Sequence, residues 1–444
     1  MTEDPELERA RATIERLFRA ALTASDPVSA VRDALVWNGH HLIVDGQRLS
    51  APQGVHIVGV GKAAAAMTAG ALATLGAAVV SGVIVTKDGH VDRALPARIQ
   101  VFEAGHPIPD QRGVDATQAI LHSLEVLPND VAVLALISGG GSALLEAPRA
   151  GLTLDDFQQT TAALLRAGAP IDALNAVRAP LSQVKAGGLR RAAPEHAWAT
   201  LILSDVLGND PRVIASGPTT PGRNDPALAL ETIARFGVEE RLPAVVMAAL
   251  RDMAYEPQPE DDRDRLVIVG ENARAVAAAQ QCALDMGLRA EVVWRAREGE
   301  ARDLGTEFVR LALMAPDEID LLLGGGEATV TVRGEGIGGR NTEFALAAAL
   351  DLEQQPDLGW VIASLATDGQ DALTGLAGAI ADAGTCQRAR ATGVDPVSAL
   401  AESDSKRVFD AAGGVVATGP TGTNVNDIYF ALRMRPEVAA GEGS

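Results

Sequence analysis

An apolar run in the first half of the chain ends in Ser138, three glycines and Ser142. Three glycines in a row cost backbone entropy, so such a turn is expected where a ligand must approach the backbone closely. Glycines also allow successive N–H groups to point inward and cradle a phosphate. The stretch lacks the lysine of a Walker motif and does not match G-x-S-x-G, so a serine nucleophile is not indicated. It predicts a phosphate-binding loop, with close packing of a strand against a helix as the alternative.

A second glycine turn, from Gly59 to Ala64, contains Lys62. A lysine at a helix N-terminus adds to the positive end of the helix dipole, so an anion is expected to bind there. The turn also matches G-x-G-x-x-A, the dinucleotide fingerprint, and Asp88 follows the next strand where an acidic ribose partner is expected. A phosphate site, a nicotinamide dinucleotide site and a solvated lysine in a tight turn are the three interpretations of this pattern.

Further cations lie in polar stretches near glycines. Four polar residues are spaced by three, four and three positions, so an unbroken helix would place them on one face. They are Asn175, Arg178, Ser182 and Lys185. In the second half of the chain, four glycines precede Arg340 and Asn341 at the expected start of a helix. An arginine held at such a position can bind a carboxylate or a phosphate through two hydrogen bonds.

Two carboxylates follow apolar strands directly. Asp205 ends the apolar strand expected within 197–210, and Asp368 follows the strand expected near residue 360. Mg²⁺ is commonly held by one or two carboxylates together with substrate phosphates, so both residues are candidate Mg²⁺ ligands. Capping of a helix is the alternative role for an aspartate in such a place.

The composition excludes several classes of protein. The chain of 444 residues has a net charge of −20 and contains 3% aromatic residues, so neither a nucleic-acid backbone nor stacked bases are expected as partners. We expect a cytoplasmic protein without membrane association, because no apolar run is long enough to span a bilayer and no signal peptide is present. The two cysteines form no CxxC pair and the seven histidines show no metal-ligand spacing.

Apolar strand patterns alternate with helical patterns along the chain, which indicates an α/β fold with a mostly parallel sheet. Strands are expected within 54–60, 79–90, 98–110, 130–142 and 197–210, with an alanine-rich helix over 61–76. The charged stretch 251–265 is the best candidate linker, which predicts an N-terminal domain over 1–250 and a C-terminal domain over 263–444. In such sheets ligands bind outside the carboxyl ends of the strands.

The motifs taken in order resemble the glycerate 2-kinase family with a C-terminal MOFRL domain. They include "GKAAAAM", "EAGHPIPD", "LISGGGSALL", "SDVLGNDPRVIASGPT", "GGRNTE" and "TGPTGTNVND", and together they span residues 62–427. The resemblance implies an N-terminal Rossmann-like domain with helices on both faces of the sheet, a C-terminal α/β MOFRL domain and an active site in the cleft between them. It also implies ATP-dependent phosphorylation of D-glycerate to 2-phosphoglycerate with Mg²⁺, and it leaves a homodimer open.

The resemblance assigns roles to individual residues, with Lys62 and Arg340 at the reaction centre. The predicted catalytic residues are Lys62, Arg340 and Asp205. The predicted substrate-binding residues are Lys62, Arg178, Lys185, Arg340 and Asn341. The predicted nucleotide-binding residues are Ser138, Gly139, Gly140, Gly141, Ser142, Gly325, Glu327 and Asn426. The predicted Mg²⁺ ligands are Asp205 and Asp368. The chain departs from the family pattern at Ala179, Pro180, Thr342, Leu373 and Gly375.

Two other functions remain open at this stage. The first is an NAD(P)H-dependent hydroxypyruvate reductase, which the fingerprint around Gly59 and Gly61 and the acidic Asp88 would support. The second is a nucleotide-binding sensor that binds ATP without phosphorylating glycerate. No histidine and acid pair suited to hydride transfer is apparent in the sequence.

Overall fold

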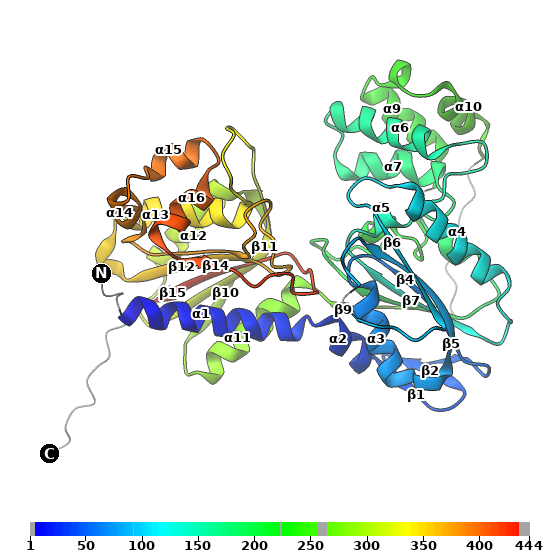
Figure 1. Ribbon diagram of the computed structural model, residues 1–444, viewed down its shortest axis with the longest axis horizontal. Coiled ribbons are helices and arrows are strands. Elements are labelled where there is room, and N and C mark those ends of the chain that lie inside the picture. The colour runs from blue at the N-terminus through cyan, green and yellow to red at the C-terminus, as the bar shows by residue number, and fades with distance from the viewer. Residues whose placement is uncertain (1–4, 92, 223, 255–263, 435–444) are drawn as a thin grey trace. The chain divides into compact units, whose positions relative to one another are not determined.

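The computed structural model describes residues 5–91, 93–222, 224–254 and 264–434. The chain divides into two compact units (Figure 1). One unit comprises Pro27–Gly270, and the other comprises Met1–Asp26 together with Glu271–Ser444. Each unit is described separately below.

The Pro27–Gly270 unit contains a six-stranded sheet in the order β6-β5-β4-β7-β8-β9, and every neighbouring pair is parallel. The strands are β4 (Val55–Val60), β5 (Val79–Lys87), β6 (Ile99–Ala104), β7 (Ala132–Ser138), β8 (Trp198–Leu203) and β9 (Arg265–Gly270). The chain builds outward from β4 to β6 and then outward in the other direction from β7 to β9. This is the doubly wound order, whose topological switch point lies between β4 and β7. The Rossmann-like sheet predicted from the sequence is confirmed.

Helices cover both faces of this sheet. Helix α4 packs on the face that carries Val58 and Val60, within one apolar cluster. The opposite face of β4 carries Gly59, where a Cβ would contact Ala64 at the start of α3. The helices of this unit are α2 (Pro27–Ala34), α3 (Ala64–Leu75), α4 (Gln111–Glu125), α5 (Gly141–Leu144), α6 (Leu154–Arg166), α7 (Ile171–Leu181), α8 (Gly188–Arg191), α9 (Pro226–Arg235) and α10 (Ala244–Asp252).

Two smaller substructures complete the unit. Strands β1 (Leu35–Trp37), β2 (His41–Val44) and β3 (Gln47–Ser50) form a separate antiparallel sheet. Helices α6, α7, α9 and α10 share an apolar core of their own around Phe157, Val177 and Ile233. Figure 1 shows this group of helices in green near α5, at the side of the sheet where the strands β4 and β7 end.

The second unit contains a mixed six-stranded sheet in the order β10-β11-β15-β12-β13-β14. The strands are β10 (Ala290–Glu300), β11 (Leu321–Thr329), β12 (Trp360–Ala366), β13 (Gly378–Ala381), β14 (Val415–Val416) and β15 (Asp427–Arg433). Only the pair β10 and β11 is parallel, because the last strand β15 inserts antiparallel between β11 and β12. Sequence analysis predicted an α/β domain here, and the structure confirms it.

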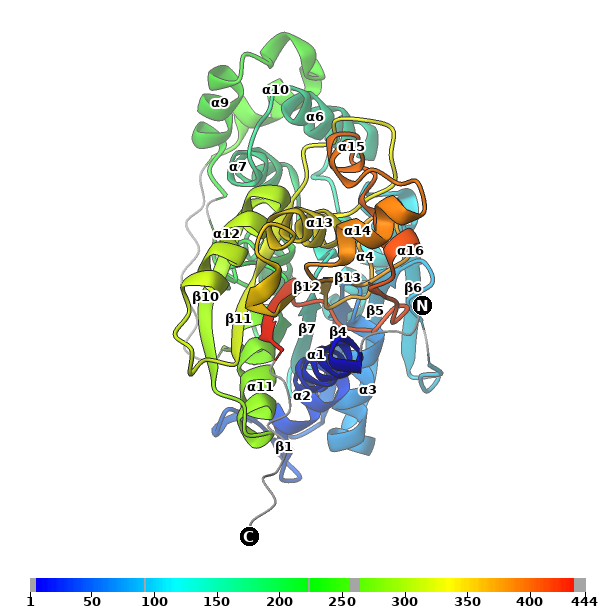
Figure 2. The same cartoon turned by 90° about the vertical axis from the view of Figure 1, so that its left-hand side faces the viewer.

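Helices again lie on both faces of the mixed sheet. Figures 1 and 2 show α12 and α13 on one face and α1 and α11 on the other. The helices are α1 (Pro5–Ala24), α11 (Asn272–Asp285), α12 (Ala301–Met314), α13 (Arg340–Leu352), α14 (Thr385–Ala391), α15 (Pro396–Ala401) and α16 (Ser405–Ala412). An aromatic cluster of Trp294, Phe308, Phe344 and Tyr429 packs between the sheet and helices α12 and α13.

The observed units differ from the expected domains of 1–250 and 263–444 at two places. Helix α1 packs against α11 and therefore lies with the C-terminal sheet. Strand β9 pairs with β8 and therefore completes the N-terminal sheet. Both differences have one cause. The unit to which α1 or β9 belongs is decided by a packing or pairing partner that is distant in the sequence, and no local sequence pattern reveals that partner. Residues 255–263 of the expected linker lie outside the described residues. Among the described helices, none is long and apolar enough to cross a membrane.

Candidate active site

The loops that follow β4 and β7 meet at the topological switch point of the parallel sheet. The backbone N–H of Lys62 donates to the carbonyl of Gly139 at 2.9 Å, and the N–H of Ala63 donates to Ser138 Oγ at 3.0 Å. A Cβ on Gly61 would lie 2.4 Å from the carbonyl oxygen of Ser138, so only glycine allows the loops to approach this closely. The two glycine turns singled out in the sequence are therefore one site.

The backbone of Lys62 is held on its carbonyl side as well. His90 Nδ1 lies 3.3 Å and Thr86 Oγ1 lies 3.4 Å from the carbonyl oxygen of Lys62. The partly exposed ammonium of Lys62 makes no ion pair with any residue that the structure describes, and the same holds for Lys87. The other two lysines are paired, Lys185 with Glu146 and Lys406 with Asp410. A fixed lysine without a carboxylate partner is suited to bind an anion from solution.

The glycine loop between β7 and α5 has close neighbours on every side. A Cβ on Gly139 would lie 1.9 Å from Asp205 Oδ2, so the absence of a side chain brings the Asp205 carboxylate against the loop. Gly140 has a φ of +83°, a conformation that favours glycine, and a Cβ on Gly141 would lie 2.6 Å from Ala215 Cβ. Among the described residues, the N–H groups of Gly139 and Gly140 find no hydrogen-bond acceptor. The loop is therefore closely packed and also keeps N–H groups that could bind a phosphate, so the two interpretations offered by the sequence do not exclude each other.

Arg178 and Lys185 lie beneath this loop and are buried. Arg178 Nη2 and Lys185 Nζ donate to the same acceptor, the carbonyl of Ser142, at 3.0 and 2.8 Å. Lys185 Nζ also lies 3.4 Å from the carbonyl of Leu145 and 3.1 Å from Glu146 Oε2. Burial lowers the pKa of Lys185 to about 8, although the carboxylate of Glu146 opposes the shift. The ammonium thus has two carbonyl acceptors and one carboxylate ion-pair partner within the protein.

These contacts change the interpretation of the predicted substrate-binding residues Arg178 and Lys185. Helix α7 ends at Leu181, with Pro180 in its last turn, so Ser182 and Lys185 do not continue one helical face. Arg178 and Lys185 nevertheless converge, because the chain turns back under the loop after α7. Their geometry supports holding the loop in place rather than direct contact with a substrate.

A chain of hydroxyl groups lies on the other side of the loop. Ser142 Oγ lies 2.9 Å from Ser216 Oγ, which lies 3.3 Å from Asn175 Oδ1. Ala215 and Ser216 adopt positive φ angles of 52° and 62°, which are uncommon for residues other than glycine. Ser216 lies in one of the motifs that carry the family resemblance, but the sequence assigns no role to it. Positive φ angles at Ala215 and Ser216 could not be predicted, because neither residue type favours them.

In the other unit, Arg340 is held by a buried carboxylate. Its Nε and Nη2 donate to the two oxygens of Asp427 at 2.7 and 2.8 Å, and Asn341 Nδ2 donates to Asp427 Oδ1 at 3.0 Å. Burial alone would lower the pKa of Arg340, but the adjacent Asp427 outweighs it and the pKa lies above its ordinary value. Arg340 Nη1 donates no hydrogen bond to any described residue, so this edge of the guanidinium is available for an anion.

Asp371 fixes the first turn of α13, where Arg340 begins. Its oxygens accept from the N–H groups of Asn341 and Thr342, both at 2.9 Å, and from Thr342 Oγ1 at 2.8 Å. A Cβ on Gly339 would lie 2.3 Å from Asp371 Cγ, which explains this glycine. Thr342, one of the departures from the family pattern, is thus part of the cap. Burial raises the pKa of Asp371, and these N–H donors oppose the rise.

The remaining predicted residues of this unit have different surroundings. A Cβ on Gly325 would lie 1.9 Å from Asn272 Oδ1, so packing of β11 against the start of α11 accounts for this glycine without a nucleotide. Asn426 has a φ of 65° and its carbonyl accepts from Thr367 Oγ1 at 2.7 Å. Glu327 is exposed near the end of β11. These residues remain predictions for nucleotide binding, and the geometry supports Gly325 least.

The candidate Mg²⁺ ligands form no complete metal site in the protein itself. Within the described part of the chain, no group of three or more histidine, cysteine, aspartate or glutamate side chains could hold a metal ion. Asp205 lies against the glycine loop, whereas Asp368 Oδ1 accepts from the N–H of Gln370 at 2.9 Å in the other unit. Mg²⁺ usually needs one or two carboxylates in addition to substrate phosphates, and the position of Asp205 fits that requirement.

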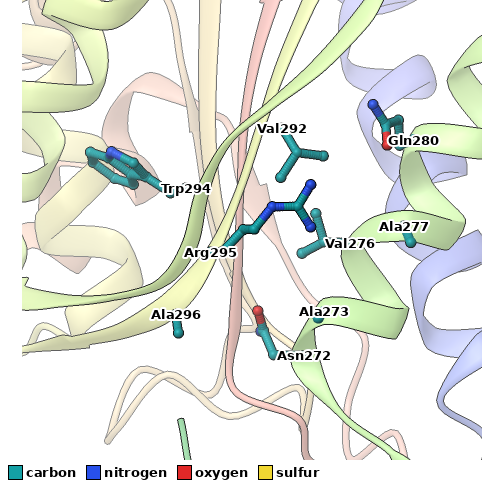
Figure 3. A pocket seen from close by; sticks show the side chains of 9 residues that line it. All are labelled: Asn272, Ala273, Val276, Ala277, Gln280, Val292, Trp294, Arg295 and Ala296. Atoms are coloured by element: carbon teal, nitrogen blue, oxygen red, sulfur yellow. The ribbon is translucent and has the colours of Figure 1, made fainter. Parts of the chain in front are cut away.

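A small pocket in the C-terminal unit does not contain the predicted residues. It lies between α11 and β10, has a volume of about 30 Å³, and is shown in Figure 3. Arg295 extends over it from a bulge of β10, and Asn272 lines it while donating to the carbonyl of Asp427 at 2.9 Å. Its volume suits about one water molecule, so we assign no ligand to it.

Comparison with known proteins identifies the family. One family model, described as a domain of unknown function (DUF4147), matches residues 13–251, and the MOFRL family model matches residues 320–427. D-glycerate 2-kinase from Thermotoga maritima is 37% identical over 387 residues, which are 85% of this chain and 90% of that protein. The chain belongs to the glycerate kinase family. This confirms the resemblance inferred from the motifs.

The fold agrees with that of a solved glycerate kinase. The crystal structure of glycerate kinase from Thermotoga maritima matches with a TM-score of 0.86 and 33% identity, and the match covers 96% of this chain and 100% of that one. A relative from Agrobacterium vitis, 40% identical over 95% of this chain and 94% of its own length, is named "Putative hydroxypyruvate reductase". Relatives of this glycerate kinase family member thus carry two different functional names.

Proposed function

We propose that this protein transfers the γ-phosphoryl group of ATP to the 2-hydroxyl of D-glycerate, giving 2-phosphoglycerate and ADP. The observation that carries the proposal is the junction at the switch point, where a lysine without an ion-pair partner among the described residues lies beside glycine N–H groups that find no acceptor in the same part of the chain. Relatives named D-glycerate 2-kinase and glycerate kinase, 34–37% identical over most of the chain, support the choice of substrate.

Each group at the switch point has a role in this proposal. The N–H groups of Gly139 and Gly140 bind phosphate oxygens of ATP, and the Lys62 ammonium binds the transferred phosphoryl group. Asp205 would hold Mg²⁺ beside the loop, where the ion would neutralise charge on the phosphates. Phosphoryl transfer depends mainly on positioning and charge neutralisation, which these groups provide.

Arg340 binds an anionic group of the substrates in this proposal, with the glycerate carboxylate as the preferred partner. The two hydrogen bonds that the guanidinium donates to Asp427 fix its orientation, so little side-chain entropy is lost when Nη1 binds an anion. Asp371 and Asn341 support the same turn and act as positioning residues.

Reduction of hydroxypyruvate is the competing function, and two contacts disfavour it. The N–H groups of Lys62 and Ala63 donate to the glycine loop and so are not available for a dinucleotide pyrophosphate. Asp88, the expected ribose partner, accepts two hydrogen bonds from Arg112 at 2.6 and 2.7 Å. That ion pair lowers the pKa of Asp88 and occupies both of its oxygens.

The product distinguishes the proposed reaction from its alternatives. We expect ³¹P NMR of a reaction with ATP, Mg²⁺ and D-glycerate to show 2-phosphoglycerate, because the family resemblance indicates the secondary hydroxyl. A dominant 3-phosphoglycerate signal would contradict the position of transfer. Oxidation of NADH or NADPH by hydroxypyruvate, followed by absorbance, would instead establish the reductase, and ATP binding without a phosphorylated product would indicate a sensor.

Substitution of Gly140 tests the glycine loop. A Cβ at this position would lie 3.2 Å from His106 Cδ2 and 3.3 Å from Lys62 Cγ, in front of the open backbone. We expect Gly140→Ala to weaken ATP binding at least about 10-fold by calorimetry, and Gly140→Val to abolish it, because the side chain obstructs the phosphates.

Gly151→Ala is the matched control for the alanine variant. Gly151 has a similar φ of +86° but no atom within 4 Å of its Cβ position, so it carries the same backbone strain without obstruction. Equal ATP affinity in the Gly140 and Gly151 variants would mean that the glycines serve packing alone.

A further inference from the structure

The loop that follows β6 places a further basic side chain, His106, beside Lys62 and the glycine loop. The position of a Cβ on Gly140 lies 3.2 Å from His106 Cδ2, 3.4 Å from His106 Nε2 and 3.3 Å from Lys62 Cγ. The imidazole and the lysine side chain therefore flank the same glycine. None of the roles assigned so far uses His106.

The backbone around His106 is held in place by a polar network. Asp110 Oδ2 accepts from the N–H of Gly105 at 3.0 Å, and Asp110 Oδ1 accepts from the N–H of Gly113 at the start of α4. Arg112 joins Asp110 to Asp88 beyond β5. The loop is thus tied both to its own helix and to the neighbouring strand, which holds the backbone next to His106 in a defined position.

The ring nitrogens of His106 have no hydrogen-bond partner among the described residues. Other histidines of the same unit differ: His56 contacts Ser81 and Ser123 through its two nitrogens, and His196 Nδ1 contacts the carbonyl of Val131. A partly buried imidazole whose nitrogens have no partner in the described part of the chain, next to the residues proposed to hold the phosphates, is available to a substrate.

Burial and, after it, the charges around His106 keep the imidazole neutral. Burial, followed by the cations Lys62 and Lys87 and by His90, lowers the pKa of His106 to about 4. These are the titratable groups that face the ring from the loops after β4 and β5. A neutral imidazole carries one nitrogen lone pair that can accept a proton, and an anionic phosphate nearby would strengthen that basicity by offsetting the cations.

We propose that His106 accepts the proton of the glycerate hydroxyl during phosphoryl transfer. In this step the O–H bond breaks and its proton moves to the lone pair of a ring nitrogen, which we assign to Nε2 because it faces Gly140. The hydroxyl oxygen forms a bond to the γ-phosphorus, and the bond from that phosphorus to the bridging oxygen breaks, its electron pair leaving with ADP. The inference rests on the proposed function.

The test compares His106→Gln and His106→Ala with His122→Ala, an exposed histidine of α4 in the same unit. We expect kcat for glycerate phosphorylation to fall about 10²-fold or more in both His106 variants, which is the usual contribution of a general base. Calorimetric ATP binding should be retained, and added imidazole should restore part of the activity of His106→Ala. His122→Ala should match the wild type.

The pH profile supplies a readout that a purely structural role would not change. Because the neutral ring is the active form, wild-type kcat should fall as the pH drops through the pKa of His106 in the ternary complex. His106→Gln should lose this acid limb. The proposal is overturned if kcat is unchanged in the His106 variants. It is also overturned if kcat is lowered but His106→Gln keeps the acid limb of the pH profile and imidazole restores no activity to His106→Ala.

Two further results complete the test. If thermal unfolding shows that neither His106 variant is folded, the pH profile of the wild type becomes the test. A wild-type kcat that does not fall as the pH is lowered below the ordinary histidine pKa of about 6.5 then overturns the proposal by itself. A wild-type protein that does not phosphorylate glycerate at all refutes the proposed function instead, so the two failures are distinguishable.

Discussion

Replacing Lys62 by alanine should lower kcat for glycerate phosphorylation by about 10³-fold, the scale of losses when a cation on a transferring phosphoryl group is removed. The ammonium has no carboxylate partner among the described residues, and its backbone is fixed by Gly139, Thr86 and His90. A cation on the moving group acts mainly in the transition state, so KM should change little. Steady-state kinetics with a coupled ADP assay measures both constants.

Lys406→Ala is the control for this experiment. Lys406 pairs with Asp410 on the surface of α16, so its removal should leave kcat and KM unchanged. If Lys62→Ala turns over at the wild-type rate, Lys62 is a solvated turn residue and the proposed mechanism fails at its centre. An increase in KM for glycerate at constant kcat would instead place Lys62 on the substrate in the ground state.

Replacing Lys185 by methionine should reduce the free energy of unfolding by about 3–5 kcal/mol, which is typical for removing one member of a buried ion pair. Lys185 and Glu146 are 1% and 0% exposed, and Glu146 has no other hydrogen-bond donor among the described residues. The Glu146 carboxylate would therefore remain buried with only the nearby charge of Arg178. Urea denaturation, followed by circular dichroism, measures the loss.

Two variants show whether the loss comes from the unpaired carboxylate. In Lys185→Met with Glu146→Met, the buried charge is gone, so about half or more of the stability should return. Lys406→Met removes a lysine from an exposed pair and should cost less than about 1 kcal/mol. A similar small cost at Lys185, or no recovery in the double variant, would show that the buried pair does not stabilise this unit.

Lys185→Met also separates a positioning role from a binding role. Because Lys185 holds the carbonyls of Ser142 and Leu145 at the end of α5, its loss should loosen the loop and raise KM for ATP more than KM for glycerate. If Lys185 instead binds glycerate directly, as the sequence predicts, the substitution should raise KM for glycerate more than KM for ATP.

Much of the parallel sheet could be predicted from local pattern. Strands β4, β7 and β8 are continuous apolar runs buried on both faces. A glycine or a polar residue ends or directly follows each of them and the partly exposed β5 and β6, so all five strands could be located from the sequence. Strand β9 was assigned to the wrong half because the chain returns to β8 only after residues 226–252, two helices that pack elsewhere. Strand pairing over that distance leaves no periodic signal in the sequence.

Residue type and spacing by themselves determined which side chains could bind anions. Glycine turns at strand ends, an arginine at a helix start and the ordered motifs of the glycerate kinase family are local properties of the chain, so Lys62, Arg340 and the glycine loop were identified directly. Only the tertiary structure decided which of these groups meet. It joined Ala63, beside Lys62, to Ser138 through the switch point, brought Lys185 under the loop to Ser142, and supplied Asp427 to Arg340 from the last strand. The partners in these three pairs are 75, 43 and 87 residues apart in the sequence. The sequence does not reveal the pairs because a buried charge or a backbone N–H group finds its partner through tertiary packing, which the spacing of residues does not record.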